Sequence, residues 1–342
     1  MSTVLLSYRF NQDCSYFIVT TNKEFKVFSC NPMEEVYKRT FDAGIGYAEM
    51  FYRSNILGLI GGGNHPKYYM NKAIIWNDKE GNPIGEFTFK SKVLGIRLRK
   101  DVILIVLETK IFVYNFNDFE LIDEIHTYPN STGCCALTSK DDFILVTPTL
   151  MQGNIGFKNY KTNKSFESKA HKGTLVAIAL SADGKLCATA SKTGTLIRIF
   201  STEHYCLLKE LRRGIEDANI TSIVFNKTGL WLACSSDRRT IHLFKLATIN
   251  KILSNLNKYK SKDFNEKDKN DLFRLKYIKK CVPPITIERS WIQIRIDERK
   301  VVLGFGEGNT IYIITDSGKF YSAVFDPNNE GECKDIECKT LI

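Results

Sequence analysis

Two neighbouring arginines stand late in the chain, in the stretch KELRRGIED at residues 209–217. Successive side chains of an extended strand point to opposite sides, so Arg212 and Arg213 could serve two different pockets rather than one. A guanidinium group stays charged and can bind two phosphate oxygens through parallel hydrogen bonds. The adjacent Gly214 allows unusual backbone dihedrals and a close approach of the backbone to a ligand. The pair therefore predicts binding of anionic groups.

The charge balance of the whole chain fits an anionic partner. The 342 residues include 48 Lys and Arg and 38 Asp and Glu, which gives a formal net charge of +10. Nucleic acid, a phosphorylated lipid surface or an acidic protein would each be attracted; a basic protein without an anionic ligand is the plainer alternative. No apolar run approaches the ~20 residues of a membrane-spanning helix, and the N-terminus lacks the pattern of a signal peptide. We expect a cytoplasmic protein whose membrane contact is peripheral.

Enzymatic chemistry finds no support in the motifs. The ten cysteines are scattered without CxxC pairs, and no Cys/His cluster has zinc spacing, so we expect reduced core thiols and no metal site. The glycine run GGGN at 61–64 lacks the Lys-Ser/Thr of a phosphate-binding loop. There is also no Cys nucleophile beside an arginine cradle. The sequence therefore predicts neither an enzyme nor a cofactor.

Repeated β segments must position the arginines. Residues 180–200 (LSADGKLCATASKTGTLIRIF) and 225–244 (FNKTGLWLACSSDRRTIHLF) each show turn, apolar strand, polar turn and apolar strand. Residues 10–29 repeat the form and 99–116 do so more loosely. A period of ~40–45 residues with short strands is typical of propeller blades, although the WD dipeptide itself is missing. We expect an all-β fold: one domain, 1–342, forming a seven-bladed β-propeller of divergent WD40-like repeats.

A basic segment without the blade pattern lies in or after the sixth blade, at 247–290. Within it, residues 251–280 hold ten Lys and Arg but only four Asp and Glu, with large apolar side chains between them. This mixture suits the surface of an anionic membrane; a merely solvated, disordered loop is the alternative. The apolar spacing fits either a strand or a loose helix. The membrane-contact residues expected here are Phe264, Leu272, Phe273, Arg274, Leu275 and Lys276.

Six segments along the chain carry a family resemblance. They are FNQDCSYFIVTTNKEFKVF at 10–28, MFYRSNILGLIGGGNHPKYYMNKAIIWND at 50–78, AHKGTLVAIALSADGKLCATASKTGTLIRIF at 170–200, ELRRG at 210–214, SSDRRTIHLF at 235–244 and GEGNTIYIITDSGKFYSAVFDP at 306–327. Together they resemble the PROPPINs, the phosphoinositide-binding seven-bladed propellers that include the WIPI proteins. The RRG triplet alone is common by chance. It indicates this family because it lies between the strand motifs TASKTGTLIRIF and SSDRRTIHLF. The family usually has Phe before the arginines, where this chain has Leu211, and often Ser in place of Thr189.

The resemblance implies two phosphoinositide sites on one rim, flanking the arginine pair. Arg212 would face the blade of 180–200, and Arg213 the blade of 225–244. Hydroxyl groups and Arg198 would hold phosphates, and His171 would add a donor that strengthens when protonated. The first site is expected to comprise His171, Thr189, Ser191, Gly194, Thr195, Arg198 and Arg212. The second is expected to comprise Arg213, Ser236, Thr240 and His242, with Ser235 and Arg239 as auxiliaries.

The function implied by the resemblance is that of a non-enzymatic effector. It would read phosphatidylinositol 3-phosphate, and the 3,5-bisphosphate, on preautophagosomal, endosomal or vacuolar/lysosomal membranes, in autophagosome formation or endolysosomal traffic. The family also implies a partner, a lipid-transfer protein of the autophagy machinery, with Asn64, His65, Pro66 and Lys67 as the candidate contact. A WD40-like protein–protein scaffold with vestigial lipid sites is the alternative. Nucleic acid is not expected, because no aromatic stacking platform accompanies the basic residues.

Overall fold

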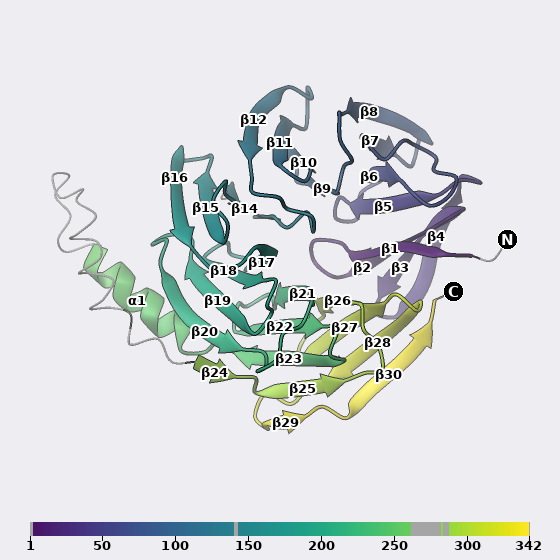
Figure 1. Ribbon diagram of the computed structural model, residues 1–342. Coiled ribbons are helices and arrows are strands. Elements are labelled where there is room, and N and C mark those ends of the chain that lie inside the picture. Colours follow the sequence, from purple (N-terminus) through teal and green to yellow (C-terminus); the bar gives the residue numbers. More distant parts are fainter. Residues whose placement is uncertain (1–2, 140–142, 261–281, 283–286, 342) are drawn as a thin grey trace.

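The chain forms seven β-sheets arranged as blades around a central axis (Figure 1), which confirms the predicted seven-bladed β-propeller. The computed structural model describes residues 3–139, 143–260, 282 and 287–341. Blade 1 contains β1 (Leu5–Phe10), β2 (Tyr16–Thr21), β3 (Glu24–Cys30) and β4 (Met33–Thr40). Blade 2 contains β5 (Ile45–Met50), β6 (Ile56–Gly61), β7 (Lys72–Asn77) and β8 (Asn82–Thr88).

The next three blades repeat this order, with each strand antiparallel to the one before it. Blade 3 contains β9 (Gly95–Leu98), β10 (Val102–Val106), β11 (Lys110–Asn115) and β12 (Leu121–His126). Blade 4 contains β13 (Ala136–Leu137), β14 (Ile144–Pro148), β15 (Asn154–Asn159) and β16 (Lys164–Lys169). Blade 5 contains β17 (Leu175–Leu180), β18 (Leu186–Ser191), β19 (Leu196–Ser201) and β20 (Leu207–Arg212).

The last two blades carry the departures from the regular pattern. Blade 6 contains β21 (Ile220–Phe225), β22 (Trp231–Ser236), β23 (Thr240–Lys245) and β25 (Ile292–Arg295). Blade 7 contains β26 (Val301–Phe305), β27 (Thr310–Thr315), β28 (Lys319–Val324) and β30 (Asp335–Thr340). Two short strands pair in parallel with outer edges: β24 (Ile287–Arg289) with β20, and β29 (Gly331–Glu332) with β25.

Burial explains the two kinds of strand sequence. The second strands β10 and β18 are buried along their whole length. Both faces of a middle strand pack against neighbouring blades, so apolar or small side chains fill every position. The outermost strands β4, β8, β12 and β16 alternate between exposed and half-buried residues instead. The core is therefore a set of apolar layers between successive blades.

The ring closes by side-chain packing between blades 1 and 7. Each of these blades is built from its own end of the chain, and among the described strands none crosses from one to the other. Phe17 lies between two rings, with its centroid 4.9 Å from that of Phe28 and 5.2 Å from that of Phe320. The Tyr8 hydroxyl also donates to the Lys300 carbonyl oxygen at 3.1 Å. Aromatic contacts between blades 1 and 7 thus close the ring without a shared strand among the described residues.

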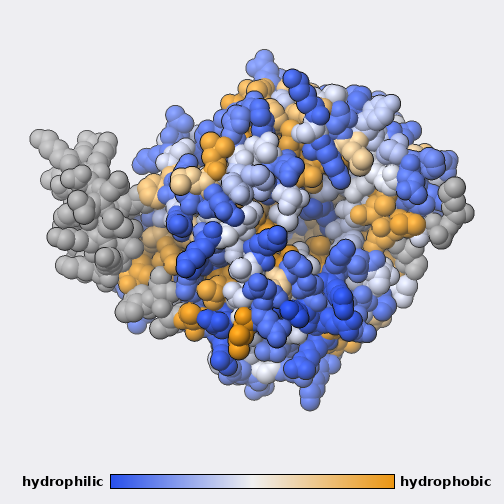
Figure 2. All heavy atoms as spheres, viewed as in Figure 1, coloured by the Kyte–Doolittle hydropathy of each residue, from blue (hydrophilic) through white to orange (hydrophobic). Residues whose placement is uncertain are grey.

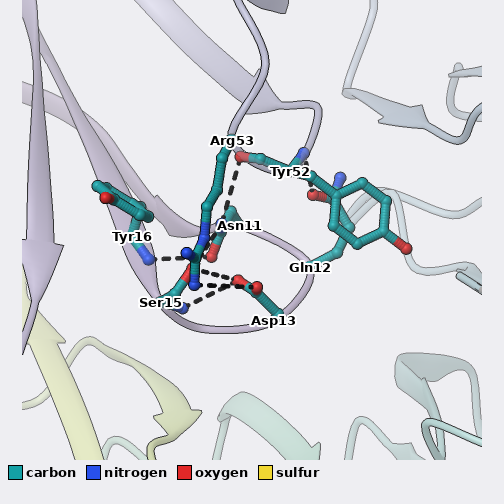
Figure 3. Close-up of polar contacts among 7 residues, drawn as sticks. All are labelled: Asn11, Gln12, Asp13, Ser15, Tyr16, Tyr52 and Arg53. Carbon is teal, nitrogen blue, oxygen red and sulfur yellow. Dashed lines mark hydrogen bonds and ion pairs between the residues drawn. The ribbon is translucent and has the colours of Figure 1, made fainter.

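The loop between β1 and β2 ties the first three blades together, and Figure 3 shows its contacts with Tyr52 and Arg53 of blade 2. The Gln12 side-chain amide donates to the Met50 carbonyl oxygen at 2.6 Å and to the Leu98 carbonyl oxygen at 3.4 Å. Its Oε1 accepts the backbone N–H of Tyr52 at 2.7 Å. Arg53 reaches back over the same loop (Figure 3). One glutamine therefore fixes the spacing of three blades.

The basic insertion leaves the propeller between β23 and β25, the third and fourth strands of blade 6. It begins with a helix, α1 (Ile249–Lys260), whose Ile252 and Leu256 pack in one apolar cluster with Leu208 and Leu211 of blade 5. The predicted membrane-contact residues all lie outside the residues that the structure describes. They are Phe264, Leu272, Phe273, Arg274, Leu275 and Lys276.

The molecular surface gives little sign of a large apolar patch on the face that Figure 2 shows. Hydrophilic side chains dominate that face, and apolar ones gather in separate small groups. Among the residues described, no helix has the length and apolar character needed to cross a bilayer.

Candidate functional site

Strand register sends the Arg212 and Arg213 side chains to opposite faces of blade 5. Leu211, which shares a face with Arg213, packs in one cluster with Cys234 of blade 6. Arg212 shares its face with Glu210, which lies opposite Arg198 in the ladder. This face is the opposite one from that of Leu211 and Arg213. The two guanidinium groups therefore diverge, one toward blade 4 and one toward blade 6.

The first site is a row of polar side chains on the blade 4 side of blade 5. Thr189, Arg198 and Glu210 lie opposite one another across β18, β19 and β20. Arg198 Nε donates to Glu210 Oε1 at 2.6 Å, and its Nη1 donates to the Ala170 carbonyl oxygen. The Arg212 side chain is half-buried and has no hydrogen bond or ion pair with any other described residue. Arg212 is thus the unpaired cation of the row, whereas Arg198 already has a carboxylate partner.

His171 is neutral at physiological pH, whereas the expected donor would strengthen only on protonation, so its contact with phosphate stays a prediction. The side chain is buried, and Nε2 lies 3.0 Å from Thr189 Oγ1. Burial, reinforced by the nearby positive charge of Arg198, lowers the pKa of His171 to about 4. The imidazole therefore orients the Thr189 hydroxyl rather than adding positive charge to the site.

The end of β18 and the turn that leads to β19 supply the remaining residues of the first site. Ser191 Oγ lies 3.0 Å from Thr193 Oγ1, so this hydroxyl has a local partner. Gly194 has a φ of 63°, and a Cβ built on it would lie 2.0 Å from the Ala218 carbonyl oxygen. Only glycine fits there. The Thr195 carbonyl oxygen accepts the backbone N–H of Arg213 at 3.0 Å, so this turn holds the arginine pair in place.

Gly214 does not use the positive φ that glycine allows, since it is absent from the described residues with positive φ. A Cβ built on Gly214 would meet no atom within 4 Å. The chain itself therefore does not require glycine here, and close approach of a ligand stays a prediction.

The second site centres on Arg213, between blades 5 and 6. The side chain is buried; Nε donates to the Gly194 carbonyl oxygen at 2.8 Å, and Nη2 donates to the Glu216 carbonyl oxygen. Burial lowers the pKa of Arg213. Its hydrogen-bond partners are carbonyls rather than carboxylates, so its charge is held in place without being neutralised by an ion pair.

Blade 6 presents three predicted residues to Arg213. Ser236, Thr240 and His242 share the face of Cys234, which packs against blade 5. His242 Nδ1 lies 3.0 Å from Ser290 Oγ. Burial, reinforced by Arg213, lowers the pKa of His242 to about 4, so this imidazole is also neutral at pH 7.

The two predicted auxiliaries do not join the second site. Ser235 lies on the opposite face of β22, where its Oγ is 2.7 Å from Thr221 Oγ1. Neighbouring strand residues cannot share a face, which is the reason for this error. Arg239 turns outward and pairs with Asp297, with Nη1 and Oδ1 2.5 Å apart.

Two residues of these sites were missed by reasoning from the sequence. Glu210 stands two places before Arg212, so strand alternation alone could have placed it beside the first site. Ser290 reaches His242 only because the chain returns from the insertion between blades 5 and 6. No pattern in the sequence indicates that contact.

The predicted partner contact lies in blade 2, across the ring from the arginines (Figure 1). Asn64, His65, Pro66 and Lys67 are exposed in the loop between β6 and β7. Their backbone is anchored to the preceding blade-to-blade loop, because the Gly44 N–H donates to the His65 carbonyl oxygen at 2.7 Å. The four residues form a surface separate from the two arginine sites.

Comparison with known proteins adds a family and a set of structural neighbours. The PROPPIN family model matches residues 4–262. Autophagy-related protein 18e of Arabidopsis thaliana is 33% identical over 98% of this chain and 87% of the relative. SVP1-like protein 2 of Neurospora crassa is 37% identical over 70% of this chain and 56% of the relative.

Solved structures agree in fold. Hsv2 of Kluyveromyces lactis superposes with a TM-score of 0.79 at 21% identity, over 100% of both chains. KlAtg21, solved in complex with the coiled coil of AgAtg16, superposes with a TM-score of 0.78 at 23% identity, over 99% of this chain and 100% of that one. At 21% and 23% sequence identity, the similarity to these structures shows a shared propeller fold and nothing beyond the fold.

Proposed function

This chain belongs to the PROPPIN family, and from that premise we propose that it is a peripheral phosphoinositide effector. It reads phosphatidylinositol 3-phosphate, and the 3,5-bisphosphate, on internal membranes. The observation that carries the proposal is the divergence of Arg212 and Arg213, neither of which is paired with a carboxylate among the described residues. The preference for the 3-phosphate rests on family membership, and the Arabidopsis thaliana relative is named as an autophagy-related protein.

The two sites divide the work of binding. In the first, Arg212 binds headgroup phosphate beside the hydroxyls of Thr189, Ser191 and Thr195. In the second, Arg213 does so beside Ser236 and Thr240. Each hydrogen bond to a charged group contributes about 1.5–3 kcal/mol at best. Two weak sites on one membrane multiply the apparent affinity by ~10²–10⁴, because the second binding event is intramolecular.

Vesicles that differ only in the inositol headgroup test this function. We expect the chain to float with phosphatidylcholine vesicles that carry the 3-phosphate or the 3,5-bisphosphate. Vesicles with the 4-phosphate or unphosphorylated phosphatidylinositol should bind at least about tenfold more weakly, because they lack the recognised phosphate. Equal binding to all vesicles of matched charge would contradict the proposal. Binding to none, with a protein partner retained, would favour the scaffold with vestigial lipid sites.

We further propose that blade 2 carries the protein partner, a lipid-transfer protein of the autophagy machinery, while the arginine sites hold the chain on preautophagosomal, endosomal or vacuolar membranes. A related propeller has been solved with a coiled-coil partner, which supports partner binding by this fold. Exchanging exposed His65 and Lys67 for alanine and glutamate should abolish capture of the partner and leave flotation unchanged. Loss of both activities, or of neither, in a folded variant would contradict this placement.

A further inference from the structure

The segment that returns from the insertion lies against both arginine sites. β24 pairs in parallel with β20, and Arg289 lies directly opposite Arg212 in this ladder. The next residue, Ser290, places its Oγ 3.0 Å from His242 Nδ1 in the second site. Figure 1 shows β24 beside the end of β20, just before the chain enters β25. Two consecutive residues therefore lie beside two different sites.

An ion pair establishes which way the Arg289 side chain projects. Lys209 Nζ lies 2.6 Å from Glu288 Oε2, so Glu288 shares the face of Lys209, on the blade 6 side of the sheet. Side chains alternate along both strands, and residues opposite each other in a ladder share a face. Arg289 therefore lies on the other face, with Arg212.

The charges on that face are not balanced. Arg198 is paired with Glu210 at 2.6 Å. Arg289 is exposed, and neither its side chain nor that of Arg212 has a hydrogen bond or ion pair with another described residue. Neighbouring strands lie about 4.8 Å apart, and like charges directly opposite each other are destabilising. An anion bound between the two guanidinium groups would remove that repulsion.

We propose that Arg289 is a third phosphate-binding arginine of the first site, delivered to blade 5 by the segment that returns from the insertion. The inference rests on the proposed function and names the ligand class more closely: an inositol headgroup with more than one phosphate. Arg212 binds one phosphate, and Arg289 binds another at the outer edge of the sheet. The insertion thereby takes part in headgroup recognition through its returning strand.

Calorimetric titration of the soluble headgroup inositol 1,3,5-trisphosphate tests the role of Arg289. The full chain carries Arg213→Gln, so that only the first site is measured. Adding Arg289→Gln should weaken binding about tenfold, since a charge-assisted hydrogen bond is lost. Arg289→Lys should recover part of that loss, because it keeps the charge without the planar fork. Lys79→Gln, which removes one exposed charge in blade 2, is the matched control and should leave affinity unchanged.

The outcomes separate the two proposals. If Arg212→Gln abolishes binding and Arg289→Gln behaves like Lys79→Gln, the inference about Arg289 is overturned and the proposed function stands. If the parent chain does not bind the headgroup, or Arg212→Gln has no effect, both are overturned. Matching thermal unfolding of the Arg289 variants, whose side chain is exposed, shows that any loss of affinity is local.

Discussion

Exchanging Arg212 and Arg213 together for glutamine is expected to lower vesicle affinity by at least ~100-fold. Each exchange removes the central cation of one site, and the double exchange also removes the avidity that joins the sites. Each single variant should retain a remnant, since the other site still engages the membrane. The measurement is flotation with vesicles carrying the 3-phosphate, over a range of lipid concentrations.

The two single exchanges differ in their structural cost. Arg212 has no described partner, so Arg212→Gln should unfold at the same temperature as the parent. Arg213 donates to the Gly194 and Glu216 carbonyl oxygens, so its exchange should also cost about 1–3 kcal/mol of stability. A chain with Lys79→Gln and Lys90→Gln, which loses two exposed charges in blade 2, controls for net charge. If the control and the double arginine variant bind alike, the lipid sites lie elsewhere.

Acidification should destabilise the propeller in a defined window, from about pH 6.5 down to about pH 4. His171 and His242 have pKa values of about 4 in the folded chain, against 6.5 ordinarily. Below pH 6.5 the unfolded chain binds protons that the folded chain does not, so the free energy of unfolding falls. Near pH 4 the folded chain also becomes protonated, and this contribution stops changing. The loss amounts to roughly 3 kcal/mol for each buried imidazole.

Urea unfolding at a series of pH values measures this effect. A chain with His171→Gln and His242→Gln should show a flatter dependence between pH 6.5 and pH 4, because glutamine does not titrate. Arg198 and Arg213 are the charged groups that help to keep these imidazoles neutral. An unchanged slope in the double histidine variant would show that other groups cause the acid sensitivity.

The repeat period predicted the fold because most blades are local units of consecutive strands. In blades 1 to 5, four strands that follow one another in the chain form one sheet, so their pattern is visible within about 45 residues. The divergence of Arg212 and Arg213 needed only strand alternation. The same alternation rules out Ser235, so that error could have been avoided from the sequence.

The remaining features depend on long-range packing. The neutrality of His171 follows from burial by other blades, and one sequence does not display burial of a polar residue. The pairing of Arg289 with Arg212 joins residues far apart in the chain through an insertion that has no repeat pattern. Gly214 was interpreted by its residue type, whereas Gly194 is the glycine that the backbone requires.

The closure of the ring by Phe17, Phe28 and Phe320 bears on how the protein is made in the cell. Blade 1 needs no strand from the C-terminal end, so we expect it to form as soon as it emerges from the ribosome. Blades 2 to 4 can follow in the order of their synthesis, whereas blade 5 also waits for β24, and blade 6 for β25 and β29. The contact between Phe17 and Phe320 forms once blade 7 has been synthesised.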